Sequence, residues 1–176
     1  MKLTPIISEE QVRQRVAELA SQIRSNYAGR ELTIIGAMKG SLFFLVDLIR
    51  NLDRPVCVDL ISVSSYRWTA TTGKPEIQMP VTIDLRGRHV LIVDDVLDTG
   101  LTLGNVLCHV RECGAESVSI CVLLIKKVLR TVDIEADYCG FELDGEFVVG
   151  YGLDLDGAYR DLPYIAAVEP DQNRPG

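Results

Sequence analysis

The spacing of apolar residues near the start of the chain predicts a helix with one buried face. The apolar positions recur every three or four residues, at Val12, Val16, Leu19 and Ile23. Ser8 and Gln11 form a capping-box pattern, which marks where the helix begins. Gly29 is a residue type that ends helices. We therefore expect the first helix to lie between these two signals.

Short apolar runs then alternate with further helical patterns. The runs predict strands at residues 32–38, 56–63, 89–93 and 118–125, and the helical patterns lie at 41–52 and 102–113. Residues 90–93 and 121–125 are apolar at every position, which is typical of strands buried on both faces of a parallel sheet. The predicted fold class is therefore α/β, with a mostly parallel sheet covered by helices on each side.

Two segments interrupt this alternation. Residues 64–80 form a polar stretch that is too long for a plain connector, so we expect a mobile lid or a flexible hairpin. Later, 138–143 and 147–151 look like short strands around the turn at Asp144–Gly145. The chain has 176 residues. Since a domain typically has about 100–200 residues, we expect a single domain, 1–176.

Composition narrows the class of partner. The formal net charge is -7 and the pI is about 4.8, which disfavours a nucleic acid partner because binding a polyanion needs clustered Lys and Arg. A small phosphorylated substrate remains possible, since backbone amides and a divalent cation can bind phosphate on an acidic protein.

The cysteines and the N-terminus bear on the compartment. Five cysteines, an odd number without a C-x-x-C pair, indicate neither a disulfide framework nor a zinc ribbon and fit a reducing compartment. The N-terminus lacks a signal-peptide pattern, and no apolar run approaches the roughly 18 residues of a membrane span. We expect a cytoplasmic protein with no membrane partner.

The segment with the clearest chemistry is Val90–Thr102, VLIVDDVLDTGLT. An apolar strand runs into Asp94, Asp95 and Asp98, and ligands of open parallel sheets bind beyond the carboxyl ends of the strands. Residues 98–102 lead into a helix, so their amides and hydroxyls could bind a phosphate. The carboxylates would then hold ribose hydroxyls or a bridging Mg²⁺. The alternative is that the acidic residues only end a strand and cap a helix.

This thirteen-residue string resembles the signature of the type I phosphoribosyltransferases. Three further segments narrow the resemblance to the hypoxanthine-guanine phosphoribosyltransferases. The first is Gly36–Gly40, GAMKG, which resembles the family's pyrophosphate loop and implies a cis or strained Met38–Lys39 peptide. The second begins at Ser65–Tyr66 and resembles the mobile catalytic loop, which closes over the reacting centre and excludes water.

The third segment concerns the purine base. By resemblance, Lys126 donates to the exocyclic O6 of the base, Phe147 stacks on its ring, and backbone groups near Val148 read its edge. Asp154 joins the metal shell, and Arg160 approaches pyrophosphate. Without the resemblance, 147–151 would be read as an apolar core strand.

The resemblance implies a type I phosphoribosyltransferase fold, with a twisted sheet, a small hood of short strands and a mobile loop. It implies transfer of the phosphoribosyl group of phosphoribosyl pyrophosphate to hypoxanthine, and also guanine, in a homodimer or homotetramer. Asp98 is the expected catalytic base, and Mg²⁺ is expected on Asp94, Asp95 and Asp154. The phosphoribosyl pyrophosphate contacts are expected at Lys39, Gly40, Asp94, Asp95, Asp98, Thr99, Gly100, Leu101, Thr102 and Arg160.

Two positions depart from the family pattern, and two other functions stay open. Asp94 stands where relatives often have Glu, and Leu155 where they commonly have Tyr, so contacts there are expected to differ. A xanthine-preferring relative is the nearest alternative enzyme. An RNA-binding regulator with the same fold is the alternative from another class, and it would need a basic face on this acidic protein.

Overall fold

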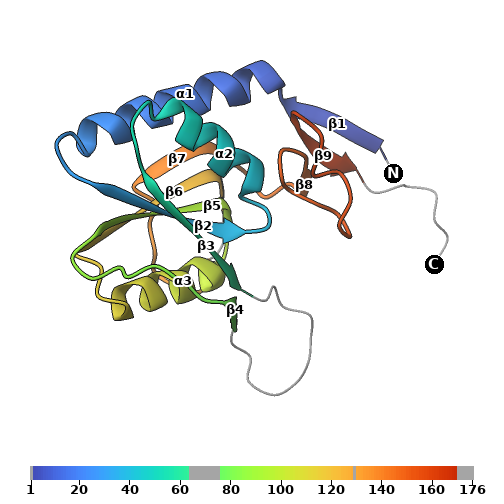
Figure 1. Cartoon of the computed structure of the whole chain (residues 1–176). Helices are drawn as coiled ribbons and strands as arrows, with labels where there is room; N and C mark the ends of the chain where they lie inside the picture. The colour runs from blue at the N-terminus through green and yellow to red at the C-terminus, as the bar shows by residue number, and fades with distance from the viewer. Residues whose placement is uncertain (1, 64–75, 129, 170–176) are drawn as a thin grey trace.

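The computed structural model of the chain describes residues 2–63, 76–128 and 130–169. Its larger sheet has the strand order β4-β3-β2-β5-β6-β7, and every pairing in it is parallel except that of β4 with β3 (Figure 1). The strands are β2 (Leu32–Met38), β3 (Cys57–Val63), β4 (Ile77–Met79), β5 (His89–Leu97), β6 (Ser117–Lys126) and β7 (Tyr138–Leu143). The predicted α/β class with a mostly parallel sheet is confirmed.

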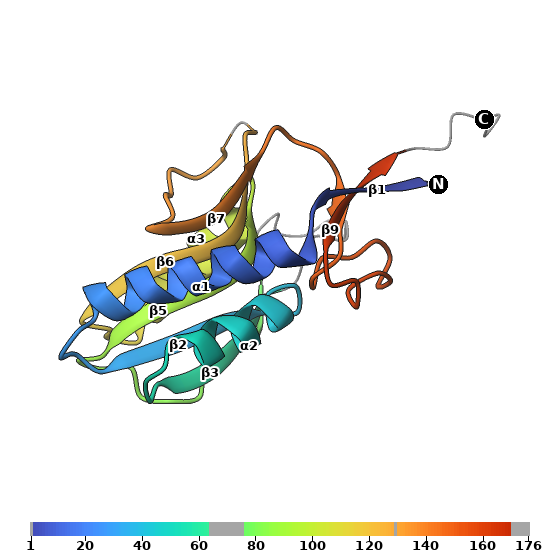
Figure 2. The same cartoon turned by 90° about the horizontal axis from the view of Figure 1, so that it is seen from above.

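Helices cover both faces of this sheet. Helices α1 (Glu9–Asn26) and α2 (Leu42–Asn51) lie on one face, and α3 (Leu101–Glu112) lies on the other (Figures 1 and 2). The capping box at Ser8 is present, and the four apolar positions that predicted α1 are all buried. Gly29, with a φ of 73°, follows the end of α1 in a turn. None of the helices in the described ranges is long and apolar enough to cross a membrane.

A second, three-stranded sheet forms a hood beside the carboxyl ends of the main strands (Figures 1 and 2). Its order is β1-β9-β8, from β1 (Lys2–Ile7), β9 (Ile165–Glu169) and β8 (Val148–Val149), and its pairings are antiparallel. The segments around the turn at Asp144–Gly145 therefore belong to different sheets. Strand β7 extends the main sheet parallel to β6, whereas β8 pairs with β9.

Strand β5 is longer than its apolar run predicts. It was expected to end at Val93, but it continues to Leu97 and keeps its pairing with β6 through Asp94 and Val96. The ten-residue strand β6 is long enough to pair with β5 as far as Leu97. Because this backbone pairing continues, Asp94 and Asp95 become part of the strand. Both carboxylates lie near the carboxyl end of β5, where they line a cavity.

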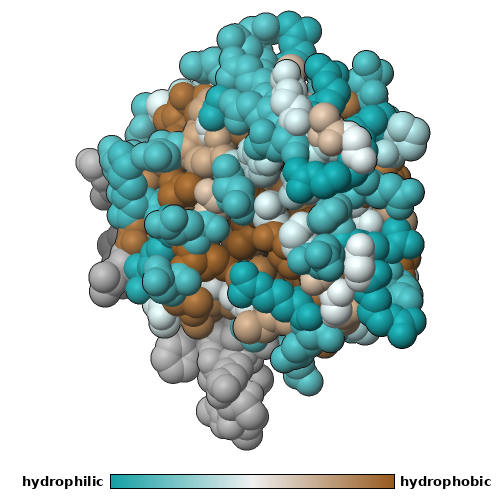
Figure 3. All heavy atoms as spheres, turned by 90° about the vertical axis from the view of Figure 1, so that its left-hand side faces the viewer, coloured by the Kyte–Doolittle hydropathy of each residue, from teal (hydrophilic) through white to brown (hydrophobic). Residues whose placement is uncertain are grey.

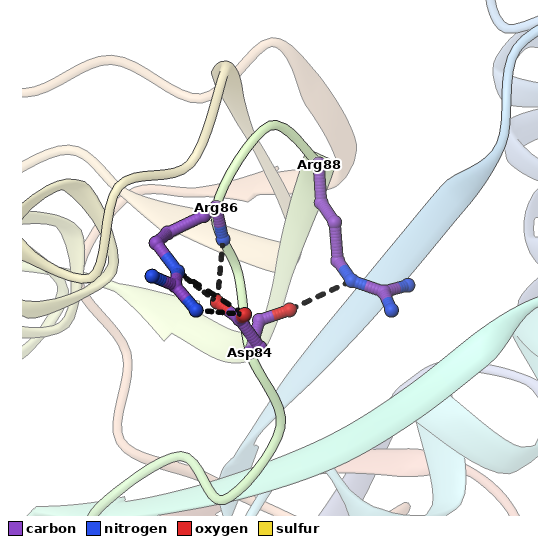
Figure 4. A network of polar contacts seen from close by, with 3 residues as sticks. All are labelled: Asp84, Arg86 and Arg88. Carbon is purple, nitrogen blue, oxygen red and sulfur yellow. Dashed lines mark hydrogen bonds and ion pairs between the residues drawn. The ribbon is translucent and has the colours of Figure 1, made fainter.

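A polar network of Asp84, Arg86 and Arg88 lies at the opposite, amino end of the sheet, in the turn before β5 (Figure 4). The guanidinium of Arg86 donates to both carboxylate oxygens of Asp84, and Arg88 Nε donates to the Asp84 carbonyl at 2.7 Å. The side-chain hydrogen bond from Arg86 lowers the pKa of Asp84 to about 2. This end of the molecule presents mainly hydrophilic side chains around an apolar band (Figure 3). The hydrogen bonds to Asp84 hold the turn before β5 in place.

Candidate active site

A cavity of about 250 Å³ lies where β2, β3 and β5 end. It brings together most of the residues predicted for phosphate, ribose and metal: Lys39, Gly40, Asp94, Asp95, Asp98, Gly100, Thr102, Asp154 and Arg160. Five predicted site residues do not line it: Thr99, Leu101, Lys126, Phe147 and Val148. Ser65 and Tyr66, predicted for the catalytic loop, lie outside the described residues.

The loop between β2 and α2 forms one wall of the cavity. Its Met38–Lys39 peptide is cis, which confirms the expectation from the sequence. Ser41 is fully buried, and its hydroxyl donates to the carbonyl of Ala37 at 2.5 Å. The amide of Leu42 donates to the Lys39 carbonyl at 3.3 Å. These bonds across the loop hold Lys39 and Gly40 between the sheet and the first turn of α2.

Gly40 lies directly against the carboxylate of Asp95. A Cβ atom placed on Gly40 would be 1.7 Å from Asp95 Oδ2, which is far inside any non-bonded contact. The hood meets the same loop from the other side, where a Cβ on Gly152 would be 2.0 Å from the Gly40 carbonyl oxygen. Glycine at both positions therefore lets β5, the β2–α2 loop and the hood converge.

Asp94 and Asp95 form a closely spaced acidic pair. Asp94 is 6% exposed and its Oδ1 accepts from the Asp95 amide at 2.9 Å, while Asp95 Oδ1 accepts from the Val96 amide at 3.0 Å. Burial, followed by the neighbouring Asp95 charge, raises the pKa of Asp94 well above its usual value. A cation or hydroxyl donors at this point would favour the ionised forms.

The loop before α3 presents backbone amides to the cavity. Gly100 is the N-cap of α3 with a φ of 82°, and no side chain of the described residues caps the helix. The alternative reading, in which Asp98 only caps α3, is therefore wrong, because its carboxylate accepts from the adjacent Thr99 amide instead. Uncapped amides at the positive end of a helix are suited to an anion.

A segment that the sequence did not single out supports this loop. The amides of Thr131 and Val132 donate to the Thr99 carbonyl at 2.9 and 3.2 Å. A Cβ on Gly100 would lie 2.8 Å from Ile134 Cγ2. Residues 130–134 carry no motif, so only the folded structure reveals that they support the loop before α3.

Asp154 and Arg160 form the hood side of the cavity. Asp154 Oδ1 is 2.7 Å from an Arg160 guanidinium nitrogen, and its Oδ2 accepts from the Gly157 amide at 2.7 Å. Arg160 also donates to the Gly152 carbonyl. No three acidic, His or Cys side chains of the described ranges converge on one point suited to a metal. The carboxylates still fit Mg²⁺, which typically takes only one or two of them together with water and substrate phosphate.

Lys126 and Phe147 lie together beyond this cavity. Lys126 is the last residue of β6, and its Nζ is 5.7 Å from the centre of the Phe147 ring. Phe147 is 50% exposed, whereas the neighbouring Val148 is buried in β8. An exposed aromatic face beside a lysine offers a stacking surface and a hydrogen-bond donor to a planar polar ring.

Comparison with known proteins connects this geometry to a family. Residues 6–156 match the phosphoribosyl transferase domain. The chain is 41% identical to the hypoxanthine-guanine phosphoribosyltransferase of Streptococcus pneumoniae strain R6 over 167 residues, which covers 94% of this chain and 93% of that protein. It is 41% identical to the Aquifex aeolicus protein of the same name over 170 residues, 96% of each chain.

Comparison with solved structures gives the same result as comparison of sequences. A crystal structure of a hypoxanthine-guanine phosphoribosyltransferase from Bacillus anthracis superposes with a TM-score of 0.89 at 40% sequence identity. The match covers 96% of this chain and all of that one. The similarity in sequence and the similarity in structure therefore both lead to proteins of the same name.

Proposed function

The chain belongs to the phosphoribosyl transferase family and, within it, to the hypoxanthine-guanine phosphoribosyltransferases, and on this premise we propose how its residues carry out purine salvage. The reaction transfers the phosphoribosyl group of phosphoribosyl pyrophosphate to hypoxanthine or guanine and releases pyrophosphate. The main support is that one cavity joins the Lys39–Gly40 loop, the acidic pair of β5 and the N-terminus of α3.

Phosphoribosyl pyrophosphate would lie across this cavity in an extended pose. Its 5′-phosphate binds the amides and hydroxyls of residues 98–102, because the helix dipole and the uncapped amides favour an anion. Asp94 and Asp95 accept hydrogen bonds from the ribose hydroxyls. Lys39, the Gly40 amide and Arg160 hold the pyrophosphate, whose negative charge grows as the glycosidic bond breaks.

Mg²⁺ would be held by the carboxylates of Asp94, Asp95 and Asp154 together with substrate oxygens. When bound, it neutralises charge on the leaving pyrophosphate. The ion pair of Asp154 with Arg160 keeps that carboxylate at the edge of the cavity. Asp95, against Gly40, fixes the distance between the ribose and the pyrophosphate loop.

The purine would stack on Phe147 with its O6 facing Lys126, and backbone groups of Val148 would bind its edge. Support comes from the 5.7 Å separation of the Lys126 ammonium and the Phe147 ring. Asp98, exposed on the loop before α3, would accept the proton that the neutral base sheds from N7 as N9 attacks. Asp98 would thus act as a base from the same loop that binds the 5′-phosphate.

Initial rates with hypoxanthine, guanine and xanthine, at saturating phosphoribosyl pyrophosphate and Mg²⁺, test this function. Turnover of the first two bases supports the proposal. Efficient use of xanthine alone would instead assign the chain as a xanthine-preferring relative. If no base reacts and filter binding captures RNA, the chain is a regulator with this fold.

We also propose that the enzyme is a cytoplasmic homodimer or homotetramer. All five cysteines are free, which suits a reducing compartment. Leu42 and Phe43, next to each other at the start of α2, are 41% and 40% exposed, as expected of side chains that a second subunit covers. Sedimentation equilibrium would check the assembly, and a monomer at micromolar concentration would refute it.

A further inference from the structure

The turn that follows β8 has an unusual backbone. Gly150, Tyr151 and Gly152 adopt positive φ values of 99°, 51° and 102°, so a tyrosine lies in the left-handed region between two glycines. A bulky side chain rarely adopts this conformation without support from its surroundings. The backbone supplies part of that support, because the Tyr151 amide donates to the Leu162 carbonyl at 2.7 Å.

The Tyr151 side chain supplies the rest by reaching α2. Its hydroxyl donates to Asp47 Oδ2 at 2.6 Å, and its ring lies 6.4 Å from the ring of Phe43. Tyr151 is 7% exposed, and Figures 1 and 2 both place the segment after β8 beside the N-terminal end of α2. Burial, helped by the bond to Asp47, raises the pKa of Tyr151, so the hydroxyl remains a donor.

This bond joins the two walls of the cavity. On one side, Asp47 and Phe43 belong to α2, which begins directly after the Lys39–Gly40 loop. On the other side, Tyr151 is followed by Gly152, which is packed on the Gly40 carbonyl oxygen. The Gly152 amide donates to the Arg160 carbonyl at 3.0 Å, and Arg160 donates back to the Gly152 carbonyl.

We therefore expect a change at Tyr151 to shift the residues around Gly152 and Arg160 relative to Lys39 and Gly40. We propose that Asp47 and Tyr151 are a positioning pair that sets the separation of these two walls and, through it, the affinity for the diphosphate group of the substrate. The proposal rests on the proposed function, because it needs a diphosphate between the walls. Neither side chain lines the cavity.

The test compares Tyr151→Phe and Asp47→Leu, which each remove the bond, with Asp47→Asn, which keeps an acceptor for the tyrosine hydroxyl. Tyr138→Phe is a matched control. The Tyr138 hydroxyl also bonds a helix, accepting from Asn26 of α1 at 2.9 Å, but at the amino end of the sheet and away from the cavity. Binding of phosphoribosyl pyrophosphate with Mg²⁺ is measured by calorimetry, and Michaelis constants and melting temperatures are measured on the same samples.

We expect Tyr151→Phe and Asp47→Leu to weaken binding of phosphoribosyl pyrophosphate by about tenfold or more, in line with a lost hydrogen bond to a charged group. The Michaelis constant for the base changes less, and Asp47→Asn recovers most of the affinity. Tyr138→Phe lowers the melting temperature but leaves the affinity unchanged.

The outcomes separate this inference from the proposed function. If the unaltered enzyme binds no phosphoribosyl pyrophosphate, the proposed function fails. If it binds, but Tyr151→Phe and Asp47→Leu bind equally well, the positioning role is refuted and the bond is only structural. Should Tyr151→Phe be too unstable to assay, the partly exposed Asp47 allows the same bond to be broken from α2, and Asp47→Leu decides alone.

Discussion

Replacing Gly40 with alanine tests the close contact at the centre of the cavity. The added methyl carbon would lie 1.7 Å from Asp95 Oδ2, 2.4 Å from Cγ and 2.9 Å from Oδ1. A carbon and an oxygen that are not bonded approach to about 3.3 Å. Gly40 is not in the left-handed region, so the methyl group alone causes the effect. The Asp95 side chain must therefore leave its position.

The cost follows from what Asp95 loses. Its Oδ1 accepts from the Val96 amide at 3.0 Å, and breaking a hydrogen bond to a charged group costs about 1.5–3 kcal/mol. A displaced rotamer adds about 0.5–1.5 kcal/mol. We expect the free energy of unfolding to fall by about 2–4.5 kcal/mol, which lowers the melting temperature of a chain of this size by about 4–18 °C. We expect affinity for phosphoribosyl pyrophosphate to fall as well, because Asp95 is proposed to bind the ribose.

The assay is chemical denaturation of a double-mutant cycle. All three atoms that the methyl would strike belong to the Asp95 side chain beyond its Cβ, so Asp95→Ala removes them. In that background, Gly40→Ala should cost less than about 1 kcal/mol. Equal costs in both backgrounds, or a Gly40→Ala enzyme with unchanged stability and kinetics, would refute the reasoning.

Three further predictions address single residues. Asp98→Asn should lower kcat by about 10²–10⁴ at unchanged stability, and a variant of normal kcat would disprove the role as base. Lys126→Met should lower kcat/KM for hypoxanthine by about 1.5–3 kcal/mol in free energy, whereas unchanged rates would show that Lys126 does not bind the base. Burial raises the pKa of Asp59, but hydrogen bonds from Thr82, Leu60 and Ile83 outweigh it and lower that pKa overall. Asp59→Ala should therefore cost about 1–3 kcal/mol at pH 7, a difference that is present above the unfolded pKa of about 3.9 and disappears in urea titrations as the pH falls through the lower folded value.

The main sheet and its helices could be predicted because their signals are local. The strand at 32–38 matched β2 residue for residue, and α1 followed from one capping box and one apolar face. The end of β5 could not be predicted, because pairing with β6 overrides the polar character of Asp94 and Asp95. Strands β1 and β9 gave no comparable signal, since each is stabilised by a partner from the other end of the chain.

The same distinction holds for the site. The acidic run and the Lys39–Gly40 joint are contiguous motifs, and the resemblance that they carry predicted the cis peptide at Met38–Lys39. The contact of Tyr151 with Asp47 spans 104 positions, and the support of Thr99 by Val132 uses backbone groups that any sequence provides. Interactions of this kind depend on the folded chain and leave no pattern in the sequence.

The strand order of the hood has a consequence for how the protein is made. Strand β9 lies between β1 and β8, with Lys2 opposite Glu169, so neither outer strand has its hydrogen-bonding partner until β9 exists. During synthesis, the strands from β2 to β7 can pair while β1 still lacks its partner β9. The hood sheet, which includes Val148 and Val149 of β8, is therefore completed only after residue 169 has been made.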